Sequence, residues 1–253
     1  MSELVSIIMP SYQTGRFIRE TIKSVLAQTY SNWELIIIDD CSTDNTDEVV
    51  SAFTGDPRIR YMKNSKNSGA AVSRNRALRE ARGKWIAFLD SDDLWEPEKL
   101  EKQIAFMKEN DCRFSYTNYI EIDEESRPNG KSVTGPRRIS KRGMYRYCWM
   151  GCLTVMYDAE AMGLIQIADI RKNNDYAMWL KICRKAECRL LDETLARYRK
   201  RGGSISNQGY VKLIKWHYKL FREAEQKPPV RAAVLTMGNL FFGVIKKIMY
   251  VKR

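Results

Sequence analysis

Histidine and paired cysteines are scarce in this sequence. Among its 253 residues there is one histidine, His217, and the six cysteines form no CxxC pair. Zinc sites are built from closely spaced cysteine and histidine ligands, so the chain offers little for one. The simplest interpretation of six unpatterned cysteines is reduced thiols in a cytosolic protein.

Long apolar runs are also missing. The run Leu4–Met9 follows the acidic start Met1–Glu3 and is too short for the apolar core of a signal peptide. No stretch approaches the roughly 20 consecutive apolar residues of a membrane-spanning helix. We therefore expect a chain that is neither secreted nor threaded through a membrane.

Glycine-rich phosphate-binding motifs are absent as well. Pro10–Gly15 follows the first apolar segment without a GxGxxG pattern, and the chain contains no Walker A sequence. These absences disfavour a dinucleotide-binding Rossmann protein and a P-loop enzyme. A phosphate pocket without a glycine cradle needs another source of positive charge, which a metal ion can supply.

Acidic residues are few in the second half of the chain. Residues 1–126 contain 16 Lys+Arg and 22 Asp+Glu, whereas residues 127–253 contain 27 and 9. The basic half is therefore expected to face an anionic partner. No helix-turn-helix, zinc-finger or RNA-recognition signature supports nucleic acid as that partner.

The most informative stretch that is present is Trp85–Asp93. Five apolar residues precede the carboxylates of Asp90, Asp92 and Asp93, which is typical of a buried strand of a parallel sheet. Carboxylates this close repel one another, and they suit Mg²⁺ or Mn²⁺ that also binds diphosphate oxygens. Alternatively, Asp92 and Asp93 only cap a helix that begins near Pro97.

Apolar segments alternate with helical patterns along the first 110 residues. The expected strands are 5–9, 35–38, 59–62 and 85–89, and the expected helices lie within 18–26, 42–53 and 68–83. This alternation predicts an α/β fold, Rossmann-like, with a mostly parallel sheet whose ligands bind at the carboxyl ends of the strands. Asp39 and Asp40 end the second strand, so they belong to that edge, unless they only solvate the strand end.

Several ordered motifs carry a family resemblance. They are Leu4–Tyr12, Ser24–Tyr30, Asp39–Asp44, Asn67–Arg76 and Phe88–Asp93. Together they resemble glycosyltransferase family 2, densely over the first 110 residues and more thinly afterwards. The resemblance implies the GT-A fold and inverting transfer of a sugar from a nucleotide-sugar donor, as in bacterial surface-polysaccharide synthesis.

The resemblance assigns the donor site. Asp40 is the candidate for accepting the imide N–H of uracil, which favours a UDP-sugar. In the DxD motif Asp90-Ser91-Asp92, Asp92 is the expected ligand of Mn²⁺ or Mg²⁺, and Asp90 lies beside the ribose or the metal. Arg74 is expected near the nucleotide, or else it braces the neighbouring acids. The nucleotide-sugar-binding residues are Pro10, Ser11, Tyr12, Asp39, Asp40, Arg74, Asp90, Ser91, Asp92, Arg199 and Arg201.

The resemblance also assigns a catalytic base, Asp175. The family opens the corresponding helix with a Glu-Asp pair, and Asn174-Asp175 stands at that position. Because Asn174 removes a neighbouring negative charge, a raised pKa of Asp175 would have to come from burial. Helix capping by Asn173, Asn174 or Asp175 is the alternative.

A second departure from the family lies in Arg197–Ser206, which resembles the family's YRxHxxSxS segment. Arg201 occupies the position of the family's histidine. An arginine cannot ligate a metal, but its guanidinium can hold diphosphate oxygens bidentately. We therefore expect a phosphate-binding loop around Arg199 and Arg201.

The remaining acceptor half, about 111–206, contains less specific patterns. Arg113–Ile122 and Trp149–Tyr157 are expected to be strands. Asp123–Arg142 is expected to be a loop, and it is rich in lysine and arginine. It is either a solvated loop or a rim over an anionic acceptor.

The chain is expected to divide into a GT-A domain, 1–206, with its nucleotide-binding half at about 1–110, and a basic, helical tail, 207–253. Residues 211–225 alternate lysines with apolar side chains, and the apolar run 234–245 ends in two lysines. Such helices suit the headgroup region of an anionic membrane. Docking against the protein's own core is the alternative.

Together with the family resemblance, these patterns predict a metal-dependent, inverting glycosyltransferase at the cytoplasmic face of a bacterial membrane, and the bacterial and surface-glycan parts are implied by the resemblance alone. Its expected acceptor is a glycan, in particular a lipid-linked one. A sugar-phosphate nucleotidylyltransferase is one alternative, but it would need a glycine- and lysine-rich first loop, which 11–15 does not provide. A noncatalytic glycan- or nucleic-acid-binding protein is the other, and it would show no metal-dependent binding of a nucleotide-sugar.

Overall fold

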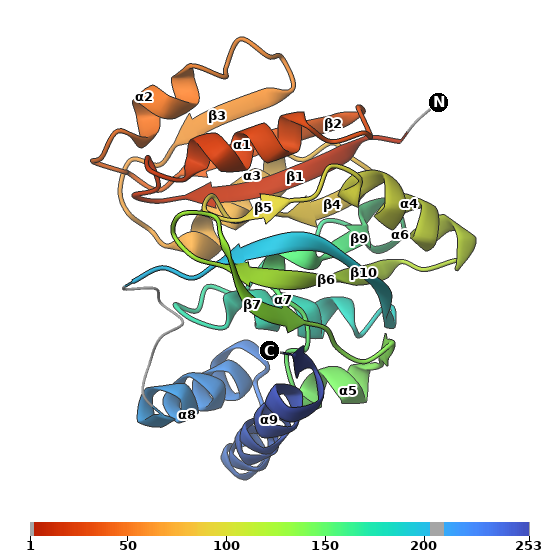
Figure 1. The fold of residues 1–253 in the computed structure, drawn as a ribbon. Coiled ribbons are helices and arrows are strands. Elements are labelled where there is room, and N and C mark those ends of the chain that lie inside the picture. The colour runs from red at the N-terminus through yellow and green to blue at the C-terminus, as the bar shows by residue number, and fades with distance from the viewer. Residues whose placement is uncertain (1–2, 203–209, 253) are drawn as a thin grey trace.

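The computed structural model describes residues 3–202 and 210–252 and shows one central sheet with helices on both faces (Figure 1). The strand order along the main path is β11-β7-β6-β9-β4-β1-β2-β3. The first four strands in sequence lie together at one side of the sheet, and they pair with one another in parallel. Their bounds are β1 Val5–Ser11, β2 Trp33–Asp39, β3 Ile59–Lys63 and β4 Trp85–Phe88.

Side chains of β1, β2 and β4 alternate between two hydrophobic cores, because successive residues of a strand point to opposite faces. Ile8, Ile36 and Phe88 join the core beneath one face, whereas Ile7 and Leu35 join the core beneath the other. Burial on both faces explains why these strands read as continuous apolar runs. The covering helices of this half are α1 Ile18–Leu26, α2 Thr46–Ser51, α3 Ala70–Glu80 and α4 Lys99–Glu109.

The second half of the sheet is mixed rather than parallel. β9 pairs antiparallel with both β4 and β6, whereas β10 pairs parallel with β6. The expected α/β fold is thus present, but its parallel order ends at β4. The strands of this half are β5 Leu94–Trp95, β6 Phe114–Ile122, β7 Pro128–Val133, β8 Arg138–Ile139, β9 Met156–Asp158, β10 Cys188–Arg199 and β11 Val251–Lys252.

Two local predictions were wrong in this half. Residues 123–142, expected to be a loop, contain β7 and β8 and lead into helix α5, Lys141–Arg146, because β6 and β10 offer edges on which they pair. Residues 149–157, expected to be a strand, begin with a 3-10 turn at Cys152–Thr154, and only the end enters β9. Helices α6, Ala159–Met162, and α7, Asn174–Ile182, complete the half.

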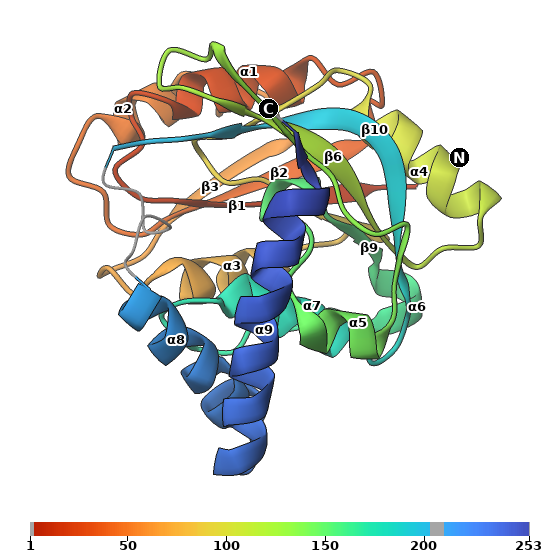
Figure 2. The ribbon, with the colours of Figure 1, turned by 60° about the horizontal axis from the view of Figure 1, so that its bottom comes forward.

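The tail packs against the acceptor half by one face only. It consists of α8 Tyr210–Lys219, a π-helical turn Leu220–Ala224 and α9 Pro229–Met249. Figure 2 shows α9 in front of α5 and α7, on the side of the sheet that carries α3. Phe221 and Ala232 are buried in the core that α3 and α7 share, so the tail does dock on the protein, which was the alternative to membrane contact. The division at residue 206 stays a prediction.

The expectation that no helix could span a membrane was wrong. α9 is one continuous helix of 21 residues that is long and apolar enough, by length and composition, to cross a bilayer. The sequence pattern concealed it because Thr236 and Asn239 interrupt the apolar run. Both of these polar side chains are buried against the protein: Thr236 donates to the carbonyl of Ala232, and Asn239 donates to the carbonyl of Tyr145.

Candidate active site

The carboxyl ends of β1, β2 and β4 bring together the predicted donor residues. In the parallel register Ser11 of β1 lies opposite Asp39 of β2, and the backbone N–H of Asp40 donates to the carbonyl of Ser11. Because β4 pairs with the other side of β1, the Asp90–Asp93 turn follows at the same edge. Pro10 and Ser11 are buried at this edge, whereas the ring of Tyr12 is 48% exposed.

Both acids at the end of β2 are held by neighbouring loops. Asp40 accepts hydrogen bonds from the backbone N–H groups of Ser68 (3.0 Å) and Gly69 (2.6 Å), so it fixes the start of α3. Asp39 accepts from the backbone N–H of Ser42 at 2.9 Å and from its hydroxyl. These contacts are more than solvation of a strand end, and they order the loops that surround the edge.

The turn after β4 is not a helix cap. Between it and α4 lies β5, and the N-terminal flanking residue of α4 is Glu98. Instead, the backbone N–H of Asp93 donates to the carbonyl of Asp90, and Asp93 accepts from the backbone N–H of Arg199 at 2.8 Å. The capping alternative for Asp92 and Asp93 therefore does not describe this turn.

Electrostatics at this turn combine burial with crowding. Burial raises the pKa of Asp93 well above its ordinary value, and the charges of Asp92 and Asp90 raise it further. Burial also raises the pKa of Asp92, although Arg201 opposes the shift. The Nε atom of Arg201 lies 2.7 Å from a carboxylate oxygen of Asp92. The arginine at the family's histidine position is thus in direct contact with the expected metal ligand.

Arg74 links the DxD turn to the helix that carries the candidate base. Its guanidinium pairs with Asp90 at 2.5 Å and donates to the side-chain oxygen of Asn174 at 2.9 Å. Although burial disfavours its charge, the charges of Asp90 and Asp175 raise the pKa of Arg74. The Nε–H of this buried side chain has no partner within the described residues, so one donor remains for a ligand.

Arg199 is held entirely by the protein. Its guanidinium donates hydrogen bonds to the carbonyl of Asp92 and to Glu20. Its other hydrogen bonds go to the turn at residues 123–126. Its side chain is fully buried. The predicted contact between Arg199 and the donor stays untested, and the geometry shows Arg199 supporting the DxD turn. Residues 203–206 of the same predicted segment lie outside the described residues.

Asp175 lies in the first turn of α7 and does not cap it. Asn173, in the left-handed region with φ 56°, precedes the helix, and no side-chain hydrogen bond caps it. Asp175 accepts one hydrogen bond, from the backbone N–H of Tyr176 at 2.8 Å. Burial raises the pKa of Asp175, and Arg74 opposes the shift. A half-buried carboxylate with a raised pKa suits general-base chemistry.

The residues present fit a divalent ion that completes its coordination with substrate oxygens. Within the described residues, no group of three or more His, Cys, Asp or Glu side chains gathers to hold a metal. Asp90 and Asp92 are two carboxylates on one turn, each with one oxygen in an arginine pair. Mg²⁺ and Mn²⁺ commonly take one or two carboxylates together with phosphate oxygens and water.

Sequence reasoning missed three participants. Asn174 was considered only as a substituted residue, yet it receives Arg74. Glu20 and Cys152 were not considered. Glu20 pairs with Arg199, and burial raises the pKa of the Cys152 thiol while the charge of Arg74 opposes that rise. No local pattern marks Glu20 or Cys152, because each reaches the site through tertiary packing.

Comparisons with known proteins agree with this geometry. The family model described as glycosyl transferase family 2 matches residues 6–163. The chain is 42% identical over 225 residues to a Bacillus subtilis protein named putative teichuronic acid biosynthesis glycosyltransferase TuaG, covering 88% of this chain and 89% of that one. It is also 42% identical over 212 residues to Escherichia coli WfgD, named UDP-Glc:alpha-D-GlcNAc-diphosphoundecaprenol beta-1,3-glucosyltransferase, covering 83% and 82%.

The fold also matches a solved structure. Residues 1–349 of S. aureus TarS in complex with UDP-GlcNAc superpose with a TM-score of 0.74 at 21% identity, covering 94% of this chain and 72% of that one. At that identity the likeness establishes the GT-A fold. The family match and the relatives establish that the protein is an enzyme of the surface-polysaccharide type, and the chain belongs to glycosyl transferase family 2.

Proposed function

We propose that this protein transfers a sugar from a UDP-sugar to a lipid-linked glycan, with inversion at the anomeric carbon and with Asp175 as the base. The observation that carries the proposal is the Arg74 bridge, which joins Asp90 of the DxD turn to Asn174, the neighbour of Asp175. The buried side chain of Arg74 thereby connects the turn after β4 to the start of α7, the helix that carries Asp175. Fixed geometry of this kind is what in-line displacement requires.

In the proposed reaction Asp175 accepts the proton of an acceptor hydroxyl. The hydroxyl oxygen forms a bond to the anomeric carbon from the face opposite the diphosphate. The bond between that carbon and the diphosphate oxygen breaks, and its electron pair leaves with the nucleoside diphosphate. A divalent ion at Asp92 and Asp90 would supply positive charge for the leaving diphosphate.

The donor is proposed to lie along the edge formed by β1, β2 and β4. We assign the base and ribose to Asp39 and Asp40, which lie at this edge with Pro10, Ser11 and the exposed ring of Tyr12. UDP-GlcNAc in TarS and UDP-Glc in the name of WfgD support uridine as the nucleoside. Arg201, already at the turn through Asp92, is proposed to hold diphosphate oxygens.

The second proposal concerns location: α9 lies on the cytoplasmic surface of the membrane. Its outward face is an apolar stripe whose side chains are 57–78% exposed, Val230, Val234, Met237, Phe241, Val244 and Ile248. Lysines of α8 and Lys247 of α9 accompany it, as expected for anionic headgroups. Because the opposite face of α9 docks on the protein, an interfacial position fits better than a span. A lipid-linked acceptor, as in the name of WfgD, supports this location.

The donor proposal is tested by thermal stabilisation with UDP-, GDP-, CDP- and dTDP-sugars, each with and without Mn²⁺. A donor at about 100 times its Kd should raise the free energy of unfolding by about 2.7 kcal/mol. We expect this with a UDP-sugar and Mn²⁺ for the wild type and its loss in Asp92→Asn. The control Glu109→Gln changes a carboxylate at the end of α4 and should behave as wild type. Equal stabilisation without metal, or none with any nucleotide, would refute the proposed site.

A further inference from the structure

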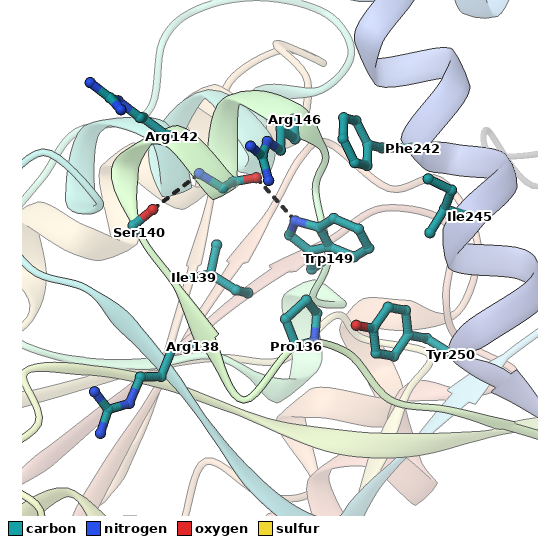
Figure 3. Close-up of a pocket in the computed structure, with 11 residues that line it drawn as sticks. Pro136, Arg138, Ile139, Ser140, Arg142, Arg146, Trp149, Phe242, Ile245 and Tyr250 are labelled. Carbon is teal, nitrogen blue, oxygen red and sulfur yellow. Dashed lines mark hydrogen bonds between the residues drawn. The ribbon is translucent and has the colours of Figure 1, made fainter.

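A cavity of about 430 Å³ lies between β8, α5 and α9, away from the donor edge (Figure 3). None of the proposed catalytic or donor-binding residues lines it. Its lining comes from two parts of the chain that are distant in sequence, residues 136–149 and 242–250. Trp149, Phe242 and Tyr250 belong to its wall, and Arg138, Arg142 and Arg146 lie at its margin.

The inner wall of this cavity is aromatic and held in place. The indole N–H of Trp149 donates to the carbonyl of Gly143 at 3.0 Å. Edge-to-face contacts join Trp149 to Phe242 and to Tyr250, with ring centroids 6.3 and 5.6 Å apart. Trp149 is therefore fixed from both sides, so the cavity has a preformed apolar surface.

The margin of the cavity is cationic and largely unpaired. Arg138 and Arg142 lie along one side, and Arg146 lies beside Phe242 (Figure 3). The carboxylate of Glu187 is 4.0 Å from Arg138, whereas no ion pair of Arg142 or Arg146 occurs in the part of the chain that the structure describes. The sequence explains this: residues 126–157 contain seven Lys+Arg and no Asp or Glu. Exposed arginines without acidic neighbours attract an external anion.

We propose that this cavity binds the diphosphate end of a lipid-linked sugar acceptor. The phosphates are held by Arg142 and Arg146, with Arg138 beside them, and the first part of the hydrocarbon chain lies on the Trp149 wall. Arginine fits this ligand because its planar guanidinium matches phosphate oxygens. A soluble phosphate compound would make no use of the aromatic wall. The inference rests on the proposed transfer to a lipid-linked glycan.

The position of the cavity supports this occupant. α9 contributes Phe242 and Ile245 to the cavity, while its other face carries the exposed apolar stripe. The cavity thus opens beside the surface that is proposed to lie on the membrane, where the hydrocarbon chain of such an acceptor would be.

The cavity is also connected to the candidate base. The ammonium of Lys246 donates to the carbonyl of Trp149 at 2.6 Å, which ties α9 to the segment around Cys148. Tyr176, the neighbour of Asp175 in α7, donates its hydroxyl to the carbonyl of Met144 in α5 at 2.6 Å. A diphosphate at the arginine margin would therefore be held beside the segment that leads from the membrane face to the base.

The test is flotation of the full chain with vesicles, in the absence of donor. Three vesicle types are compared: phosphatidylcholine alone, phosphatidylcholine with undecaprenyl diphosphate, and phosphatidylcholine with phosphatidylglycerol at equal surface charge. We expect the wild type to bind best to the undecaprenyl diphosphate vesicles. Arg142→Glu/Arg146→Glu should lose about tenfold in that binding and much less on phosphatidylglycerol, because paired guanidinium contacts to phosphate are lost. Trp149→Leu should also weaken binding to undecaprenyl diphosphate.

The matched control is Arg19→Glu/Lys23→Glu, which makes the same charge change at the same helical spacing on exposed positions of α1. It should bind all vesicles as the wild type does. Equal losses on phosphatidylglycerol and undecaprenyl diphosphate would overturn the inference in favour of general attraction to an anionic surface. Unchanged binding of the double variant would overturn it outright. Stabilisation by UDP-sugar, measured on the same variants, reports separately on the donor site.

Discussion

Two regions of this molecule treat charge in opposite ways. At the edge formed by β1, β2 and β4, half-buried carboxylates are matched by arginines within the chain, as in the Arg74–Asp90 and Arg201–Asp92 pairs. At the α5–α9 face, Arg142 and Arg146 are exposed and no ion pair of theirs occurs in residues 3–202 and 210–252. The first region balances its own charges, and the second leaves them for a partner.

This difference shows what each region requires of its ligand. Removing the arginine partner of a half-buried carboxylate costs free energy. A metal and a diphosphate that bind at Asp90 and Asp92 must therefore replace the contacts that these carboxylates already make. Arg142 and Arg146 of α5 are exposed and make no ion pair within the described residues. An anion can therefore bind to them without breaking an existing ion pair. Selectivity is therefore expected at the donor edge, and attraction of an anionic substrate at the α5–α9 face.

The largest effect is predicted for the base. Asp175→Asn keeps the size of the side chain but removes the proton acceptor, so kcat should fall about 10²- to 10⁴-fold. Binding of the donor should change far less than kcat, because Asp175 lies on α7 and not on the strands that form the donor edge. Initial rates of sugar transfer and UDP-sugar stabilisation measure the two properties separately.

The pH profile of the wild type adds a second readout. Because burial raises the pKa of Asp175, the base becomes protonated at a higher pH than an ordinary aspartate. As the pH is lowered, kcat/KM should therefore start to decrease before the pH reaches ~4. This acid limb should be missing in Asp175→Asn. A variant that retains full kcat, or a wild-type profile that is flat down to pH ~4, would assign the proton transfer to another group.

A pair of arginine substitutions sharpens the comparison through stability. Arg74→Met leaves Asp90 without its partner inside the protein and should lower the free energy of unfolding by about 2–3 kcal/mol. Arg142→Met, the same change on the α5–α9 face, should alter it by less than about 0.5 kcal/mol. Denaturant unfolding of both variants measures the difference. Similar losses would mean that the two regions do not differ in how their charges are balanced.

Local signals in the sequence were sufficient for the donor edge. Continuous apolar runs that end in acids located β2 and β4, and the parallel register then brought Asp39 and Asp90 to one edge, as expected. The pairing of Arg74 with Asn174 joins residues 100 positions apart, and that of Arg199 with Glu20 joins residues 179 apart. No periodicity specifies such pairs, because they depend on how helices dock on the finished sheet.

The acceptor side was harder to predict for the same reason. β7 and β8 exist because β6 and β10 provide pairing edges. The sequence of β7 is largely polar and contains proline and glycine, and β8 has only two residues. The helical tail was predicted, but the length and apolar character of α9 were obscured by Thr236 and Asn239, whose burial only the tertiary structure reveals. The cavity beside Trp149 needs both of these elements, so it could not be read from the chain.

The smallest effect is predicted for the outward stripe of α9, where only partial burial in lipid is at stake. Met237→Ser/Phe241→Ser removes apolar surface from two side chains that are 71% and 64% exposed. Full burial of such a side chain contributes roughly 1.5–3 kcal/mol, and insertion to headgroup depth contributes only part of it. Losing that part for both side chains should weaken vesicle binding about tenfold. The free energy of unfolding should stay within about 0.5 kcal/mol of the wild type.

A control on the docked face of the same helix separates membrane contact from packing. Thr236→Val removes a hydroxyl that is buried and bonded within α9, and it leaves the outward stripe intact. It should leave vesicle binding unchanged. If the stripe variant binds vesicles as well as this control does, α9 does not lie on the membrane, and the hydrocarbon chain of the proposed ligand must leave the Trp149 cavity by another side. If only the stripe variant is released, the outward face of α9 contacts the membrane.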